Sequence, residues 1–273
     1  MTRRSVLLRS LLFLSVLTAS VWTAPTVQAA PETVTIAAAN SLKDAFRKIL
    51  PLFEAHNKDI TVRVIYGPSQ TLSKQIEEGA PIDVFLPSLV EEIDQLEKKG
   101  LVIQGTKRIY ASTSLVLVAG PELPAPITSA QDLRTTLIRY IAIGDPKTSS
   151  VGKVAEQYLK YSKLDTQLKS QLVYGEHSRA VLDLVAKGEA DLGIVYRTDA
   201  VSNKKIRILD EAPVDSHQPV HYGVAAVWTA KNISGAGDFI NFLGRPQIQS
   251  LLQDHGFDRI AEPIGVAQRQ EGR

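Results

Sequence analysis

Short runs of β-branched and apolar residues alternate with amphipathic helical patterns along nearly all of the chain after residue 30. The first set runs from a strand pattern at 34–37 through a helical pattern at 42–53 to strand patterns at 61–66 and 82–86. Strands that alternate with helices are typical of parallel sheets covered by helices on both faces. The sequence therefore predicts an α/β fold.

A second set of strand and helix patterns follows a proline-rich stretch at residues 121–126. Two continuous apolar strands, at 114–119 and 221–228, bracket this set. We expect two lobes, each a mostly parallel sheet flanked by helices, joined by two crossover strands. The predicted boundaries are residues 1–29 for an export signal, 30–113 plus 222–273 for lobe 1, and 114–221 for lobe 2.

The first 29 residues have the pattern of an export signal. A basic start is followed by a mostly apolar run at 11–22, and Val27-Gln28-Ala29 fits a cleavage site after small residues. The apolar run is shorter than the roughly 20 residues of a membrane-spanning helix. We expect a soluble, exported protein that is cleaved near Ala29. The general secretory and twin-arginine routes both stay open.

The amino-acid composition limits which cellular compartment and which binding partners can be expected. The chain contains no cysteine, which excludes disulfides, thiolate metal sites and a lipid anchor on an N-terminal cysteine. Because a soluble protein without an anchor is best confined by an outer membrane, we expect it in the periplasm. Cleavage removes three arginines and leaves 28 basic and 29 acidic side chains. A nearly neutral chain without a basic run is not expected to bind nucleic acid.

Five segments place a hydroxyl or a run of backbone N–H groups where a predicted strand ends and a helix begins. Helix N-termini leave backbone donors unpaired and carry partial positive charge. Open α/β sheets bind ligands at the carboxyl ends of their strands, so these segments are expected to converge on one cleft. Neutral donors in such a cleft suit a small, fully deprotonated oxyanion. The segments are 38–42, 67–71, 144–152, 176–179 and 193–196.

Taken alone, each segment also has an ordinary structural explanation. Ser41-Leu42-Lys43-Asp44 is a near match to a capping box, which predicts a serine cap at the start of the first helix. Ser69 follows Gly67-Pro68 and fits a cap or a turn residue. Tyr196 ends a strand pattern, where a phenol ring usually packs in the core. Their occurrence at strand ends in both halves of the chain is what favours a shared site.

Two other classes of function have less support. An exported hydrolase needs a base beside its nucleophile, and the best pair, His177 and Ser178, consists of adjacent residues that point apart at a helix start. No Gly-x-Ser-x-Gly motif occurs. His217 and His221 have a spacing seen in metal sites on helices, but a proline lies between them, so an exposed loop is expected. Glu92 and its acidic neighbours are predicted to lie on a solvated helix face.

Longer stretches resemble a known family. The likeness, which extends over nearly the whole mature chain, is to the molybdate-binding proteins of periplasmic ABC importers. It is carried by Ala-Ala-Ala-Asn-Ser-Leu at 37–42, Ser-Gln-Thr-Leu at 69–72, Gln-Ile-Glu-Glu-Gly-Ala-Pro-Ile-Asp-Val-Phe at 75–85, Gly-Asp-Pro at 144–146 and Gly-Ile-Val-Tyr-Arg-Thr-Asp-Ala at 193–200. The run Leu86-Pro87-Ser88-Leu89 departs from the family pattern. The resemblance implies the two-lobed periplasmic-binding-protein fold with two crossover strands.

The resemblance also implies a ligand, a partner and a set of site residues. The ligand would be molybdate, with tungstate as a close mimic and another tetrahedral oxyanion such as sulfate as the alternative. An inner-membrane ABC permease would receive the ligand from a monomeric binding protein. Neither catalysis, a cofactor nor direct protein ligands to a metal are expected. The residues are Ser41 and Ser69 through hydroxyls and backbone amides, Val151 and Ser178 through backbone amides, and Tyr196 through its hydroxyl.

Overall fold

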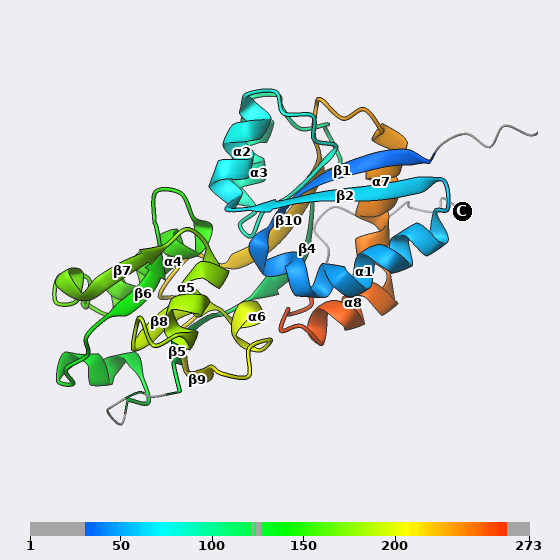
Figure 1. The fold of residues 1–273 in the computed structure, drawn as a ribbon. Coiled ribbons are helices and arrows are strands. Elements are labelled where there is room, and N and C mark those ends of the chain that lie inside the picture. Colours follow the sequence, from blue (N-terminus) through cyan, green and yellow to red (C-terminus); the bar gives the residue numbers. More distant parts are fainter. Residues whose placement is uncertain (1–30, 122, 124–126, 261–273) are drawn as a thin grey trace, which may run out of the picture. The chain divides into compact units, whose positions relative to one another are not determined.

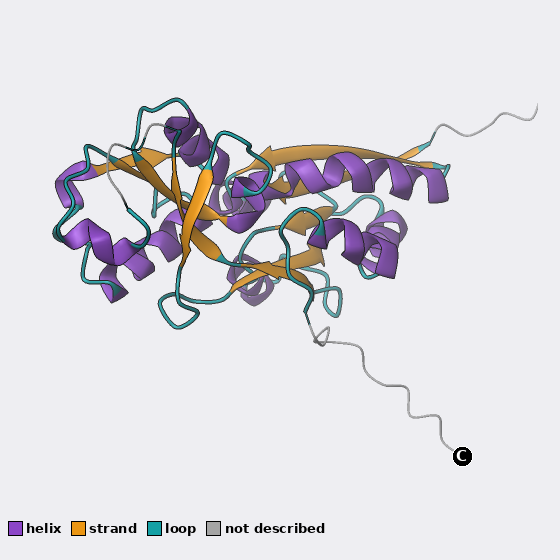
Figure 2. Ribbon diagram, turned by 90° about the horizontal axis from the view of Figure 1, so that it is seen from below, coloured by secondary structure: helices purple, strands orange, loops and turns teal. Residues whose placement is uncertain are grey.

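The computed structural model describes residues 31–121, 123 and 127–260 of the chain (Figure 1). The predicted export signal, most of the proline-rich stretch and the last 13 residues of predicted lobe 1 lie outside the described residues. The described part contains two five-stranded sheets with helices packed on them, as drawn in Figure 2. The predicted two-lobed α/β fold is confirmed.

The first sheet has the strand order β2-β1-β3-β10-β4. Four of its strands come from the first half of the chain, and β10, from the last quarter, is inserted between β3 and β4. The strands are β1 (Glu32–Ala39), β2 (Ile60–Gly67), β3 (Val84–Leu86), β4 (Arg108–Thr113) and β10 (Val220–Ala226).

The second sheet has the order β7-β6-β8-β5-β9. It repeats the arrangement of the first sheet. Three strands, β7, β6 and β8, run parallel to one another, and β5, which enters from the first sheet, lies between β8 and β9. The strands are β5 (Leu115–Ala119), β6 (Ile141–Gly144), β7 (Leu172–Gly175), β8 (Leu192–Tyr196) and β9 (Arg207–Glu211).

Both sheets are mixed, with two parallel and two antiparallel pairings each. In the first sheet β1 is parallel to β2 and β3, whereas β10 is antiparallel to β3 and β4. In the second, β6 is parallel to β7 and β8, whereas β5 is antiparallel to β8 and β9. Helical crossovers connect strands that run the same way, but β5 and β10 enter directly from the other sheet and run against their neighbours.

Helices cover both faces of the first sheet (Figure 1). The first helix, α1 (Lys43–His56), places Phe46 and Phe53 seven residues apart on its buried face, against Phe239 of α7 (Ile233–Leu243). The cluster on this face also includes residues of α8 (Pro246–Gln253). A separate apolar cluster joins the opposite face to α2 (Ser69–Glu77) and α3 (Glu91–Lys98).

The second sheet is covered in the same way. Apolar residues of α4 (Ser150–Tyr161) pack with β6 and β8 in one cluster. On the other face, α5 (Ser178–Ala186) and the short α6 (Arg197–Ala200) contribute to a cluster that contains Val116 and Val195. Short 3₁₀ segments, η1 (Asn40–Leu42), η2 (Ala130–Arg134) and η3 (Lys169–Gln171), occur in the connections.

The chain passes from the first sheet to the second through Ser114, the single residue between β4 and β5. It returns through the connection between β9 and β10. Both passages lie close to the predicted bracketing strands at 114–119 and 221–228. The sequence does not predict the strand β4, because polar residues interrupt its apolar pattern.

Candidate functional site

One small cavity has all five predicted site residues in its lining. The lining comes from the ends of β1, β2 and β8 and from the first residues of α2, α4 and α5. Each of the five is at most 5% exposed, and they are Ser41, Ser69, Val151, Ser178 and Tyr196. Residues from helices on both sheets therefore converge, as the placement of the segments at strand ends predicted.

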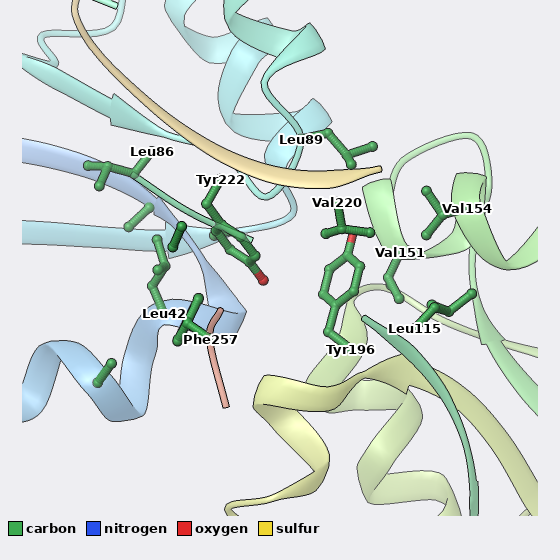
Figure 3. Packing of buried hydrophobic residues seen from close by; sticks show 14 of the residues in the cluster. Leu42, Leu86, Leu89, Leu115, Val151, Val154, Tyr196, Val220, Tyr222 and Phe257 are labelled. Atoms are coloured by element: carbon green, nitrogen blue, oxygen red, sulfur yellow. The ribbon is translucent and has the colours of Figure 1, made fainter. Parts of the chain in front are cut away.

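The cavity has a volume of about 20 Å³, enough for roughly one water-sized group. Figure 3 shows its neighbourhood, with Tyr196 and Val151 on the side of the second sheet and Tyr222 and Leu42 on the side of the first. The rings of Tyr196 and Tyr222 meet edge to face with centroids 6.2 Å apart. The site is thus built at the contact between the two sets of elements, and the Tyr196 ring in its lining packs against Tyr222 of the first sheet.

The hydroxyl of Ser41 is oriented by Tyr222 of β10. The Tyr222 phenol donates to Ser41 Oγ at 2.7 Å, so the proton of Ser41 is free to donate to a different acceptor. The predicted capping box at Ser41 is wrong: Ser41 lies in η1, α1 has Leu42 at its N-cap, and no side chain caps it. Instead of capping a helix, the Ser41 hydroxyl is bonded to Tyr222, which lies 181 residues further along the chain.

Ser69 and Ser88 form a second pair of hydroxyls. Ser69 Oγ accepts from the backbone N–H of Ser88 at 3.0 Å, and the two hydroxyl oxygens are 3.2 Å apart. Tyr196 Oη donates to Ser88 Oγ at 3.4 Å from the second sheet. Ser69 does not cap α2, whose N-cap is Pro68. Ser88 also lines the cavity, and it adds a hydroxyl that the sequence interpretation did not assign.

Backbone donors come from the first turns of α4 and α5. The N–H groups of Val151 and Ser178 have no hydrogen-bond acceptor within the described ranges. Ser178 Oγ accepts from the N–H of Tyr196 at 3.3 Å, which fixes the end of β8 beside the start of α5. Both N–H groups are of the kind that binds anions at helix N-termini.

Close backbone contact places the start of α4 at this cavity. A Cβ atom on Gly152 would lie 2.3 Å from the carbonyl oxygen of Gly144, and one on Gly144 would lie 2.7 Å from the nitrogen of Gly152. Side chains at either position would therefore push α4 away from the end of β6. The two glycines of the predicted segment 144–152 bring the donors of α4 within reach of the cleft.

No lysine or arginine is among the described residues that line the cavity. Arg179, which lies in the predicted segment 176–179, is instead paired with Asp44 of α1 and has its Nε 3.5 Å from Oδ1 of Asp199. His177 lines the cavity, and burial lowers the pKa of its ring. Its Nδ1 accepts from the N–H of Ala180 at 3.1 Å, which places the proton of the neutral ring on Nε2.

These contacts also bear on the hydrolase alternative. Among the described residues His177 makes no hydrogen bond to Ser178, because its Nδ1 caps α5 and the serine hydroxyl accepts from Tyr196. The phenols of Tyr196 and Tyr222 stay protonated, since burial raises the pKa of each well above its usual value. The described chain therefore offers hydrogen-bond donors here but no activated nucleophile.

Glu92 corrects a prediction. Its carboxyl was expected on a solvated face of α3, but it is only 5% exposed and accepts from Ser150 Oγ of α4 at 2.7 Å. Burial raises the pKa of Glu92 to about 7. The local acidic pattern carries no signal of this burial, because the covering helix belongs to the other sheet.

The five hydroxyl or amide positions, set at the contact of two α/β lobes, define a ligand-binding protein of the bilobal kind. The chain belongs to the bacterial extracellular solute-binding protein family, whose model matches residues 34–258. Within the described residues, no helix is long and apolar enough to cross a membrane.

Two molybdate-binding proteins and one sulfate-binding protein are among the proteins to which this chain is similar. The molybdate-binding protein ModA of Haemophilus influenzae is 32% identical over 232 residues, which cover 84% of this chain and 91% of that protein. The structure of the periplasmic molybdate-binding protein of Azotobacter vinelandii aligns with a TM-score of 0.74 at 19% identity, over 82% of this chain and 98% of that one. The sulfate-binding protein SubI of Mycobacterium tuberculosis also has a TM-score of 0.74, at 21% identity, over 84% of this chain and 88% of that one. The fold by itself therefore does not separate the two oxyanions.

The hydroxyl of Tyr222 is expected to contribute to ligand binding through Ser41. Replacing Tyr222 by Phe removes the donor to Ser41 Oγ and should weaken oxyanion binding by about 0.5–1.5 kcal/mol, the net value of one hydrogen bond. Tyr110→Phe is the control, because Tyr110 packs against Tyr222 but its buried hydroxyl has no partner in the described structure. Calorimetric affinities that fall equally in both variants would contradict this assignment.

Proposed function

We propose that the protein captures molybdate, and also tungstate, in the cavity between its two lobes and delivers it to an ABC permease. The observation that carries the proposal is the convergence of hydroxyl and backbone donors on one buried cavity without a cationic side chain in its lining. A fully deprotonated tetrahedral dianion accepts at every oxygen and needs no acceptor from the protein. The names of relatives that share about a third of the residues support molybdate as this dianion.

The composition of the lining disfavours other anions. Phosphate is partly protonated near neutral pH and is best met by an arginine together with a carboxylate acceptor. Neither residue type lines the cavity within the described chain. Sulfate shares the charge and the shape of molybdate, so it is the competitor that the experiment must include.

Capture requires the lobes to move. A four-oxygen anion is larger than the single water-sized group that the cavity accommodates. The lobes must therefore separate to admit it, by bending at Ser114 and at the connection from β9 to β10, and then close over it. A ligand that is bound from both sides favours the closed state, which a permease can recognise.

The proposal also covers the location of the protein, its oligomeric state and its partner. The protein is exported to the periplasm after cleavage near Ala29, acts as a monomer, and hands its ligand to an inner-membrane permease. It uses no cofactor and catalyses no reaction. Membership of the extracellular solute-binding family supports this placement.

Titration calorimetry of the mature protein tests the ligand. Molybdate and tungstate should each bind saturably at one site, sulfate should bind at least about tenfold more weakly, which corresponds to about 1.4 kcal/mol, and phosphate should not bind. A preference for sulfate would reassign the protein to the alternative oxyanion. No saturable binding of any of the four anions would refute an oxyanion site.

A further inference from the structure

A carboxyl group lies one hydroxyl away from the proposed oxyanion site. Glu92 of α3 and Ser150 of α4 belong to helices on different sheets, and Ser150 Oγ is 2.7 Å from Oε1 of Glu92. The second oxygen of Glu92, Oε2, is buried and has no hydrogen-bond partner within the described residues. A buried carboxylate with one oxygen unpaired is costly, whereas a protonated carboxyl in the same place is not.

Ser150 connects this carboxyl to the cavity. It lines the cavity as the first residue of α4, next to Val151, whose N–H is one of the proposed donors. When Glu92 is ionised, the Ser150 proton is directed to the carboxylate and is withheld from the cavity. A carboxylate at this distance also repels a dianion through a poorly screened interior.

We propose that closure over the oxyanion is coupled to uptake of one proton by Glu92, which turns Ser150 into an additional donor to the ligand. The proton comes from solvent and binds Oε1, which then donates to Ser150 Oγ. The Ser150 O–H is released from Glu92 and rotates toward the oxyanion. No other bond forms or breaks. This inference rests on the proposed oxyanion site.

The charges around Glu92 agree with a proton equilibrium near neutral pH. Burial raises the pKa of Glu92 to about 7, the Ser150 hydrogen bond lowers it, Glu91 raises it and Lys153 of α4 lowers it. When the lobes separate, the carboxyl regains water and its pKa should return toward the ordinary value of about 4.3. Other titratable groups near it are Lys74 and Glu77 of α2, which share its groove, Tyr196 of β8, and His177, which lines the cavity.

The coupling predicts the sign of the pH effect. A carboxyl whose pKa is higher in the bound, closed state takes up a proton on binding, so affinity falls as pH rises through that pKa. Between pH 6 and pH 8 the affinity for molybdate should fall about tenfold. Dilute molybdate stays a dianion over this range, so the change reports on the protein.

The experiment is titration calorimetry with sodium molybdate at pH 6, 7 and 8, repeated at pH 7 in two buffers of different ionisation enthalpy. The wild-type protein should take up about half a proton at pH 7. Glu92→Gln mimics the protonated carboxyl, so it should bind without proton uptake and with an affinity independent of pH. At pH 8 it should bind several hundredfold more tightly than the wild type, because a pKa that rises from about 4.3 to about 7 makes the protonated form bind about 500-fold more tightly than the ionised form. Glu77→Gln is the matched control, because it removes the same charge from the same groove without contact to Ser150, and it should keep the wild-type slope.

The possible outcomes distinguish a failure of the proton coupling from a failure of the proposed function. Tight molybdate binding with no proton uptake by the wild type at pH 7 would overturn the inference and leave the oxyanion site intact. A wild-type slope that persists in Glu92→Gln would also overturn it and assign the proton to another group such as His177. If Glu92→Gln fails to fold, the wild-type proton count decides by itself. Absence of molybdate binding at every pH would instead refute the proposed function.

Discussion

Loss of the hydroxyl at Ser41 or at Ser69 is expected to weaken molybdate binding by about 1.5–3 kcal/mol in each case, or roughly 10- to 150-fold. The reason is that each side chain supplies a hydrogen bond to a charged ligand from a buried position, where water cannot replace it. Neither serine caps its helix, so its replacement should not lower the stability of the ligand-free protein through the loss of a helix cap. Calorimetry of Ser41→Ala and Ser69→Ala measures the loss, and urea unfolding of the free proteins measures stability.

Ser73→Ala provides the matched control for these variants. Ser73 is a buried serine of α2, one turn beyond Ser69, and it lies outside the cavity lining. Its replacement should leave the affinity for molybdate unchanged. Affinities that stay at the wild-type value in both Ser41→Ala and Ser69→Ala would show that the ligand binds elsewhere.

The positions of these serines could be predicted because they depend on short-range patterns. Strand ends and helix starts are readable from the sequence, and topology brings the carboxyl ends of parallel strands to one edge of a sheet. That rule was sufficient to place Ser41, Ser69 and Tyr196 around one cavity. It also extends to Ser88, which lies two residues after the end of β3, although the departure of this loop from the family pattern concealed its contribution.

Other features depend on contacts between residues that are far apart in sequence. The bond from Tyr222 to Ser41 joins residues 181 positions apart, and it replaced a cap that the local pattern predicted. Glu92 looks like a solvated residue on its own helix, yet it is buried and accepts a hydrogen bond from Ser150 of α4, 58 positions along the chain. The order of strands likewise follows from the passages between sheets, which turn an expected mostly parallel arrangement into a mixed one.

The second large effect is expected on the free energy of unfolding, and it comes from a cluster of charged side chains made of Asp199, Arg179 and Asp44. Asp199 of α6 is fully buried, and neither carboxylate oxygen has a hydrogen-bond partner among the described residues. Burial raises the pKa of Asp199 to about 6, whereas the nearby Ser178 hydroxyl and the charge of Arg179 lower it. Arg179 also pairs with Asp44 of α1, so it connects the second lobe to the first.

Arg179→Met is expected to lower the free energy of unfolding by about 3 kcal/mol at pH 7, the lower end of the range for breaking a buried ion pair, because the arginine is 26% exposed. The loss should be smaller at pH 5. A carboxyl whose pKa in the folded state lies above its unfolded value binds an extra proton on folding, so its contribution to stability falls as pH rises between the two values. Without Arg179 the folded pKa of Asp199 rises further, which extends that decline past neutral pH.

Urea unfolding at pH 5 and pH 7 measures this dependence, and two variants identify its cause. Arg47→Met removes a cation that pairs with the same Asp44 at 3.2 Å but is 68% exposed, so it should cost less than about 1 kcal/mol at either pH. Adding Asp199→Asn to Arg179→Met should restore most of the stability lost at pH 7, because the uncompensated charge is gone. A loss that is equal at both pH values and unaffected by Asp199→Asn would mean that Arg179 stabilises the fold by packing and by its pair with Asp44, and not by balancing the buried charge of Asp199.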